Sequence, residues 1–504
     1  MTSITQPEER HPGAFAPPGK GDEPSSGGES SAPEPGKLRG NLGAIAIIFT
    51  VLAFNAPLGV AGGFVPVVIG NGNHDGAPAT FIVIAVMLVL FSVGLLAMSR
   101  FMHSCGAFYS YIVAGLGRVI GLGGAYTALA AYTAFCCCGY AFCGLVTRAL
   151  VADAFPDSHI PWWVWSLMFW VVSAALSLAN INLSARILGV ALVAEIGVTL
   201  IWGLRVFFNG GPSGVSLHPL TPSAFFGGGS ISVALLFAAM CITGFEAVAV
   251  FREEAKDPVK TVRRATYGSV IFMCGFYAFV AWAYLTGYGP DALAQAADPI
   301  GSFKASVRTY AGTVAYDAVS IMLLTSGFAS VLANVNIGAR YLFTLGGDGV
   351  LPRKLGKVHP KQGSPYIAAA VFATICLIGA IIIPALAGID ALTVYVDLAA
   401  IGGVCLLLLM LVTSVAVPVF FRRTNGHTAS AWESKVAPIL ASVALAVVFS
   451  LSVIHMPDII GADQTVANIA LAVIAFFAIA GIGNALYLRS RKADIFQRIG
   501  RQDL

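Results

Sequence analysis

The stretch that decides the fold is Pro57-Leu58-Gly59-Val60-Ala61-Gly62-Gly63, which lies in the middle of a long apolar run. Proline lacks the amide hydrogen that a helix needs, and glycine tolerates non-helical backbone angles, so these residues predict a break in a helix. A break at mid-depth in a bilayer leaves N–H and C=O groups that need polar partners. We therefore take all seven residues as candidate binding residues, with a simple packing kink as the alternative.

The composition around this stretch is that of an integral membrane protein. Of the 504 residues, 57% are apolar and only 11% are charged, whereas an ordinary soluble domain is about 25% charged. The net charge of +4 is too balanced to indicate a nucleic-acid partner. The apolar composition instead indicates that the protein lies in the lipid bilayer.

Twelve apolar stretches are long enough to cross a hydrocarbon core of about 30 Å. They are residues 43–70, 79–98, 119–147, 162–185, 187–204, 230–251, 265–290, 309–339, 362–389, 391–421, 436–457 and 464–488. The predicted fold class is therefore an all-α integral membrane protein with twelve transmembrane helices.

The distribution of cations predicts the orientation of these spans. If the first span starts in the cytoplasm, all but four of the 29 Lys and Arg residues fall on the cytoplasmic side, and the exceptions are Arg148, Arg205, Lys304 and Arg308. Cytoplasmic loops of membrane proteins carry such an excess of Lys and Arg. We expect a multi-pass protein of the plasma or inner membrane with both termini in the cytoplasm.

The two ends of the chain differ from the part between them. Residues 1–40 are rich in Pro, Gly, Ser and Glu, and we expect a disordered cytoplasmic tail because such a segment cannot bury enough apolar surface. A basic stretch followed by an apolar one, typical of a signal peptide, is absent there. We expect a transmembrane domain over 41–490 and a cytoplasmic tail over 491–504.

A second candidate break lies in the sixth span, at Cys241-Ile242-Thr243-Gly244-Phe245-Glu246. Two interrupted spans that are five spans apart indicate a five-plus-five inverted repeat with discontinuous first and sixth helices. The expected repeats cover 41–208 and 228–421, and two extra helices follow over 434–489.

The two breaks together suggest a ligand. Free amides at the start of the second half of span one suit a carboxylate, and free carbonyls at the end of the first half of span six suit an ammonium group. A zwitterionic amino acid satisfies both. We therefore add Cys241, Ile242, Thr243, Gly244 and Phe245 to the candidate substrate-binding residues.

Four acidic residues fall inside the predicted spans, and two of them, Glu195 and Glu246, are candidates for coupling or gating. Buried carboxyl groups are costly in hydrocarbon, so such residues usually face a cavity or a partner. Glu195 is either a proton carrier or a hydrogen-bonded carboxyl that joins span five to spans one and eight. Glu246 either gates the pocket or caps the amides of the unwound segment.

Several motifs resemble the amino acid-polyamine-organocation (APC) superfamily of permeases. They are Gly244-Phe245-Glu246, Glu253-Glu254-Ala255-Lys256-Asp257-Pro258, Arg263-Arg264-Ala265, Asn336-Ile337-Gly338-Ala339-Arg340-Tyr341, Gly347-Asp348-Gly349-Val350-Leu351-Pro352, His359-Pro360, Ser364-Pro365 and Gly106-Ala107-Phe108-Tyr109-Ser110-Tyr111. The resemblance covers about residues 40 to 490. It implies the five-plus-five fold and alternating-access uptake or exchange of amino acids or related amines.

The chain departs from this family at two positions. Many relatives have Gly-Ser-Gly in the first span, whereas Pro57 to Gly63 contains no hydroxyl group. Several proton-coupled relatives carry a lysine where the alignment puts Glu195, so that lysine's role is not carried over. In relatives, the glutamate that matches Glu246 is implicated in gating or pH response.

We expect a secondary active transporter of an amino acid, coupled to protons or run as an exchanger, and acting as a monomer or homodimer. A carrier of polyamines, ethanolamine or another small amine is the alternative within the fold, and a receptor or channel is the alternative outside it. An enzyme would need a nucleophile with a base, or a histidine-carboxylate cluster, within the spans, and the sequence contains neither. No cofactor or metal motif is visible, since the histidines and cysteines lack ligand spacing.

Overall fold

The computed structural model describes residues 43–102, 107–178, 185–246, 248, 257–359, 364–423 and 429–500. Throughout these ranges the regular structure is helical and no strand occurs, which confirms the all-α prediction. The predicted tail over residues 1–40 lies outside the described residues, as do Glu253 to Lys256 of the sixth-span motif.

Each of the twelve predicted spans corresponds to one helix or to a helix in consecutive pieces. These helices are α1 (Ala44–Asn55), α2 (Pro57–Val67), α3 (Ala77–Ser99), α5 (Arg118–Ala154), α6 (Trp162–Leu178), α7 (Ala185–Asn209), α9 (Ile231–Met240), α10 (Pro258–Tyr288), α13 (Thr313–Gly347), α14 (Tyr366–Leu377), η7 (Ile378–Ile382), α15 (Ile383–Ala387), α16 (Ala391–Arg423), α17 (Ala437–Ile454) and α19 (Gln464–Arg491). In the described ranges, nine helical stretches are long and apolar enough to cross a membrane, and α6 and α9 are shorter apolar helices.

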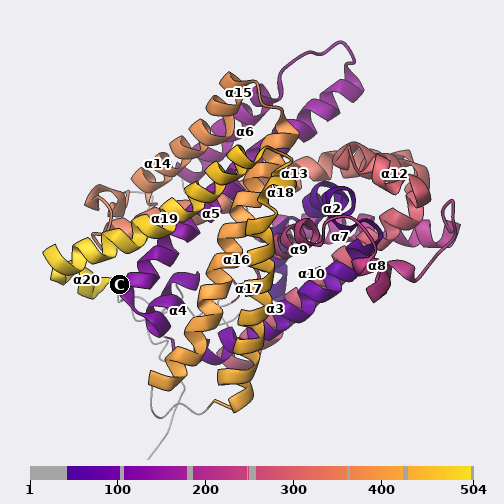
Figure 1. The fold of residues 1–504 in the computed structure, drawn as a ribbon. Coiled ribbons are helices and arrows are strands. Elements are labelled where there is room, and N and C mark those ends of the chain that lie inside the picture. Colours follow the sequence, from indigo (N-terminus) through magenta and orange to yellow (C-terminus); the bar gives the residue numbers. More distant parts are fainter. Residues whose placement is uncertain are drawn as a thin grey trace, which may run out of the picture. The chain divides into compact units, whose positions relative to one another are not determined.

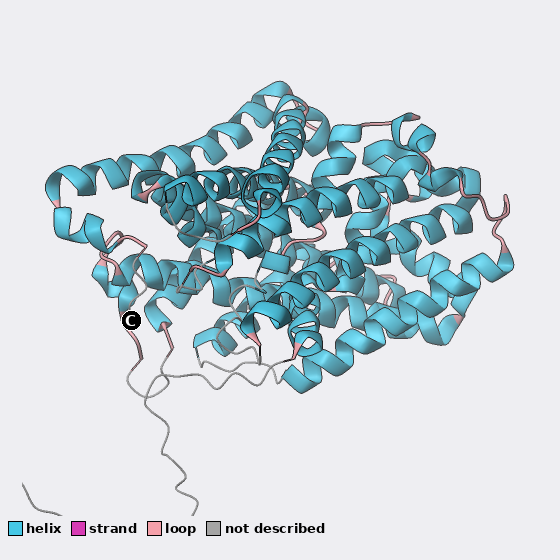
Figure 2. Cartoon of the chain, turned by 90° about the horizontal axis from the view of Figure 1, so that it is seen from below, coloured by secondary structure: helices cyan, strands magenta, loops and turns pink. Residues whose placement is uncertain are grey.

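Short helices connect or flank these spans. They are η1 (Val68–Asn73), η2 (His74–Gly76), α4 (Ala107–Leu116), η3 (His218–Leu220), α8 (Pro222–Phe226), η5 (Gly289–Asp291), α11 (Ala292–Gln295), α12 (Pro299–Ala311), η6 (Arg353–Gly356), η8 (Trp432–Val436), α18 (Met456–Ile460) and α20 (Ala493–Arg498). Figure 2 shows that helices make up most of the described chain, with loops between them.

The long helices pack side by side around α5 and α16. Helix α5 contacts α16, α13 and α19, and α16 also contacts α17 and α9 (Figure 1). Helix α10 packs against α3 and α1. Helix α2 is enclosed by α7, α9, α10, α12 and α13, so the second half of the first span lies in the interior of the bundle.

The first span is discontinuous, but the break lies just before the predicted stretch. Helix α1 ends at Asn55, and Ala56 adopts a left-handed conformation with φ of 53° and ψ of 68°. The residues Pro57 to Gly63 are helical, which corrects the expectation that they themselves unwind. The physical reason is that proline at the first position of a helix loses no hydrogen bond and has a suitable φ.

The sixth span breaks where the sequence predicts it. Helix α9 ends at Met240, and residues 241–244 form turns that continue into a short 3-10 turn at Phe245 and Glu246. Gly244 has a φ of 103°, a value that glycine adopts far more readily than other residues. The discontinuous first and sixth helices are therefore both present.

Candidate functional site

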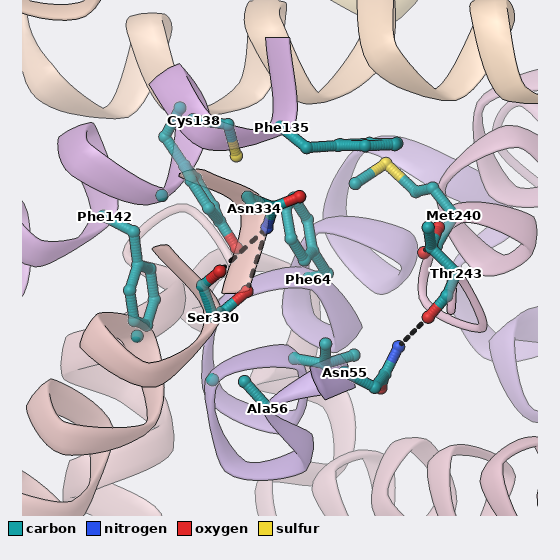
Figure 3. A pocket seen from close by; sticks show the side chains of 15 residues that line it. Asn55, Ala56, Phe64, Phe135, Cys138, Phe142, Met240, Thr243, Ser330 and Asn334 are labelled. Atoms are coloured by element: carbon teal, nitrogen blue, oxygen red, sulfur yellow. Dashed lines mark hydrogen bonds between the residues drawn. The ribbon is translucent and has the colours of Figure 1, made fainter. Parts of the chain in front are cut away.

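A cavity of about 100 Å³ lies beside the two breaks, several times the volume that a single buried water needs. Its walls come from α1 and α2, from α5, from the end of α9 and the turn after it, from α13 and from α16 (Figure 3). The lining residues are Asn55, Ala56, Gly59, Val60, Phe64, Phe135, Cys138, Gly139, Phe142, Met240, Thr243, Gly327, Ser330, Asn334 and Tyr395.

Three of the predicted binding residues line this cavity: Gly59, Val60 and Thr243. The other nine are not among the lining residues: Pro57, Leu58, Ala61, Gly62, Gly63, Cys241, Ile242, Gly244 and Phe245. Three of these nine make backbone hydrogen bonds to side chains near the breaks: Leu58, Cys241 and Gly244. The predicted pair of segments therefore meets at one site, while most of the walls come from other helices.

The start of α2 presents backbone amides beside the cavity. Pro57 has no amide hydrogen, the Leu58 amide donates to Glu195 at 3.5 Å, and the Val60 amide donates to Ala56 at 3.1 Å. The Gly59 amide belongs to the first turn of α2, where a helix supplies its amide groups with no partner of its own. The positive end of the α2 dipole and the first-turn amide of Gly59 thus lie beside the cavity, a combination that favours an anionic group.

Asn55 connects the two breaks, and the sequence analysis did not identify it. Its side-chain amide nitrogen donates to the carbonyl oxygens of Cys241 at 2.7 Å and Thr243 at 2.9 Å. Its side-chain oxygen accepts a hydrogen bond from the Tyr277 hydroxyl. The carbonyl groups that were expected to be open therefore each have one partner already, although a carbonyl oxygen can accept a second hydrogen bond.

Glu195 joins three helices rather than lining the cavity. Its carboxylate accepts hydrogen bonds from the Ser326 hydroxyl at 2.9 Å and from the Leu58 amide at 3.5 Å. The side chain comes from α7, Leu58 is on α2 and Ser326 is on α13. This is the geometry expected for a carboxyl group that links span five to spans one and eight.

Glu246 caps the unwound part of span six. Its carboxylate accepts a hydrogen bond from the Gly244 amide at 2.9 Å and another from the Tyr132 hydroxyl at 3.4 Å. The side chain is buried and does not line the cavity. Its position matches the capping alternative of the sequence analysis.

Aromatic rings form one wall of the cavity. The Tyr395 ring stacks on Phe64 with a centroid separation of 4.5 Å, and it lies 5.4 Å from the Phe142 ring. Phe135 adds a further ring to the lining, and no lining residue carries a charged side chain. On the α13 side, Asn334 donates to the Ser330 carbonyl oxygen at 2.9 Å (Figure 3).

Metal ligands do not gather in the described parts of the chain. Within them, no group of three or more His, Cys, Asp or Glu side chains could hold a metal ion. The described cysteines are buried, and none forms a disulfide.

The family of this chain follows from a comparison with known proteins. A family model described as "Amino acid permease" matches residues 43–487, which is most of the chain. The chain belongs to the amino acid permease family. The resemblance to APC permeases is thereby confirmed, and the chain is a multi-pass membrane protein of a family of transporters.

Relatives of this permease differ in their substrates. The low-affinity putrescine importer PlaP of Escherichia coli K12 is 25% identical over 68% of this permease and 74% of that importer. The branched-chain amino acid permease BcaP of Lactococcus lactis subsp. cremoris is 29% identical over 35% of this permease and 38% of its own length. BcaP of Bacillus subtilis is 28% identical over 45% of each chain.

Proposed function

We propose that this permease carries a zwitterionic amino acid with an apolar side chain across the membrane by alternating access. The observation that supports this most is the cavity between the two breaks, which offers the first-turn amides and the dipole of α2 on one side and an aromatic wall on another. The amide and dipole suit a carboxylate. The rings suit an apolar side chain, because burying it removes apolar surface from water.

The ammonium group of such a substrate has acceptors nearby. The carbonyl oxygens of Cys241 and Thr243 each accept one hydrogen bond from Asn55 and keep a second lone pair. Thr243 lines the cavity, and the side chains of Ser330 and Asn334 lie on its α13 wall. Neutral oxygen acceptors are sufficient for one ammonium group that is balanced by its own carboxylate.

Putrescine is the second candidate, because PlaP, a relative that matches over the greater part of both chains, is a putrescine importer. An aromatic wall can hold a cation through its ring faces. A diamine, however, brings two positive charges and no negative one. None of the lining residues carries a carboxylate, and the carboxylates of Glu195 and Glu246 already accept hydrogen bonds from the protein.

Uptake into proteoliposomes distinguishes the two candidates. We expect saturable uptake of labelled L-leucine, with competition by isoleucine and valine and no competition by putrescine at the same concentration. Vesicles without protein, together with a mock-purified sample, are the controls. Saturable uptake of putrescine without uptake of any amino acid would overturn the proposal.

We further propose that transport is coupled to protons through Glu195. Its buried carboxyl group touches the α2 amide beside the cavity, so the charge on this group and the position of α2 are linked. The groups that contact it are the Leu58 amide and the Ser326 hydroxyl.

Replacing Glu195 with Gln is expected to flatten the pH dependence of uptake. Glutamine keeps an oxygen that can accept from Leu58 and Ser326 but cannot change its charge. The measurement is the initial rate of uptake between pH 5 and pH 8, corrected for the amount of inserted protein, with Glu246→Gln as the comparison. A pH profile identical to that of the wild type would leave Glu195 with a structural role only.

The proposed orientation puts both termini in the cytoplasm. Two of the four cations expected outside, Lys304 and Arg308, lie beside Tyr316, and Lys304 forms an ion pair with Asp153 at 2.7 Å. Arg118, which is expected inside, donates to the Ile499 carbonyl oxygen near the C-terminus at 3.3 Å. Arg118 and Asp153 lie at opposite ends of α5. This supports opposite sides of the membrane for the cations expected inside and the cations expected outside, as the distribution of cations predicts.

A further inference from the structure

Phe135 on α5 and Met240 at the end of α9 form an apolar end of the cavity. In Figure 3 both side chains lie on one side of the cavity, and Asn55 and Ala56 of the first break lie on the opposite side. The first turn of α2 follows directly after Ala56. An amino acid whose carboxylate lies at the start of α2 therefore directs its apolar side chain toward Phe135, an orientation that rests on the proposed function.

The Phe135 ring rests on Gly402 of α16, a buried glycine that is not among the lining residues. A Cβ atom at Gly402 would lie 2.8 Å from each of two atoms of the Phe135 ring and 3.1 Å from a third. Carbon atoms attract each other best at about 3.5–4.0 Å, so these separations are repulsive. The ring thus touches the α16 backbone on one side and borders the cavity on another.

The cavity is the space into which the Phe135 ring can move. Helices α5 and α16 pack against each other, and the interior of a folded protein has few voids larger than a water molecule. A methyl group added at Gly402 would push the ring away from α16, and the adjoining space that is not already filled is the cavity. The absence of a side chain at Gly402 therefore keeps the ring back from the substrate.

We propose that Gly402 positions the Phe135 ring and that the two residues together limit the length of the substrate side chain. Cys138 and Gly139, three and four residues after Phe135, are small and line the cavity from the same face of α5. Phe135 is the bulky residue that ends this face of the cavity. We expect the wild type to bind L-leucine more tightly than L-phenylalanine, because the ring leaves no room for the longer side chain.

The test measures binding of L-alanine, L-leucine and L-phenylalanine to the purified permease in detergent micelles by titration calorimetry. Gly402→Ala should weaken leucine binding about tenfold or more, because one methylene in an apolar pocket is worth about 10–200-fold. Alanine binding should be nearly unchanged, since its methyl side chain ends before the ring. Phe135→Ala should raise the affinity for phenylalanine relative to leucine by about tenfold or more.

A double variant separates this role from general damage to the fold. Adding Phe135→Leu to Gly402→Ala replaces the ring by a smaller side chain and should restore leucine binding close to that of the wild type. Two substitutions that act independently would instead add their losses. Gly483→Ala on α19, where a Cβ atom would meet nothing within 4 Å, is the matched control and should leave all three affinities unchanged.

Each outcome decides the proposal. Loss of leucine binding in Gly402→Ala with alanine binding retained, and its recovery in the double variant, support it. Equal weakening of alanine and leucine, or no recovery in the double variant, would overturn it while amino acid binding by the wild type stands. Phe135→Ala tests the same limit without overpacking, so a wild-type ratio of phenylalanine to leucine in that variant would also overturn it. If the wild type binds none of the three amino acids, the proposed function itself fails.

Discussion

Replacing Asn55 with alanine is expected to abolish uptake and to destabilise the protein. The substitution leaves the carbonyl oxygens of Cys241 and Thr243 and the hydroxyl group of Tyr277 without the partner they have now. Each buried group that loses its partner costs about 1–3 kcal/mol. Because Asn55 is the side chain that ties the break in span one to the break in span six, both half-helices should lose their relative position.

The measurements for Asn55→Ala are the initial rate of uptake per inserted protein and the melting temperature in detergent. We expect a drop in rate of more than tenfold and a clearly lower melting temperature. Asn55→Asp should be at least as severe, because a carboxylate would face two carbonyl oxygens that need a donor. Asn209→Ala, at an exposed side chain that donates only to Arg205, is the matched control. Wild-type uptake by Asn55→Ala would show that the two breaks do not depend on this link.

Asn55 also illustrates what the sequence could not reveal. Composition and span length were enough to predict the helices, because the cost of leaving backbone groups unpaired in lipid permits few other structures. An asparagine two residues before Pro57 was a visible signal, since an amide inside an apolar span needs a partner. Its partners, however, are more than 180 residues away in the sequence, and no local pattern identifies them.

The first break shows how far local propensity can be trusted. Proline and three glycines predicted an unwound stretch, yet Pro57 begins α2 and the glycines remain helical within it. Glycine permits non-helical angles without requiring them. Here its lack of a side chain is used for close packing, as at Gly63 against Tyr395. The strained residue is Ala56, whose left-handed conformation nothing in its own chemistry predicts.

The cavity walls were the least predictable part. Phe135 and Phe142 on α5, Asn334 on α13 and Tyr395 on α16 come from helices whose apolar residues surround them on all sides. A membrane-spanning helix that is apolar on every side has no polar face that would indicate which residues point to a cavity. The acidic residues were easier to identify from the sequence, because a carboxyl group in an apolar span is rare. In the structure, both Glu195 and Glu246 accept hydrogen bonds beside the breaks.

Replacing Gly62 with valine is expected to abolish uptake while the protein still inserts into the membrane. A Cβ atom at Gly62 would lie 3.1 Å from both the Leu323 side chain and the Phe303 ring. The Phe303 ring is fully buried and packs against Trp202 at 5.0 Å, so it has little room to move. Overpacking of this kind typically costs about 1–3 kcal/mol. Valine adds two further methyl groups, so α2 must shift away from α12 and α13 and carry the Gly59 amide with it.

The matched control for Gly62→Val is Gly189→Val on α7, where a Cβ atom would meet nothing within 4 Å. We expect wild-type uptake from the control, an uptake rate at least about tenfold lower from Gly62→Val, and an intermediate rate from Gly62→Ala, because a single methyl group needs only a small shift of Leu323 and Phe303. Membrane insertion is followed by quantifying each protein in the purified membrane fraction. If Gly62→Val transports at the wild-type rate, the position of α2 against α12 and α13 does not govern transport, and the amide at its start is not the group on which substrate binding depends.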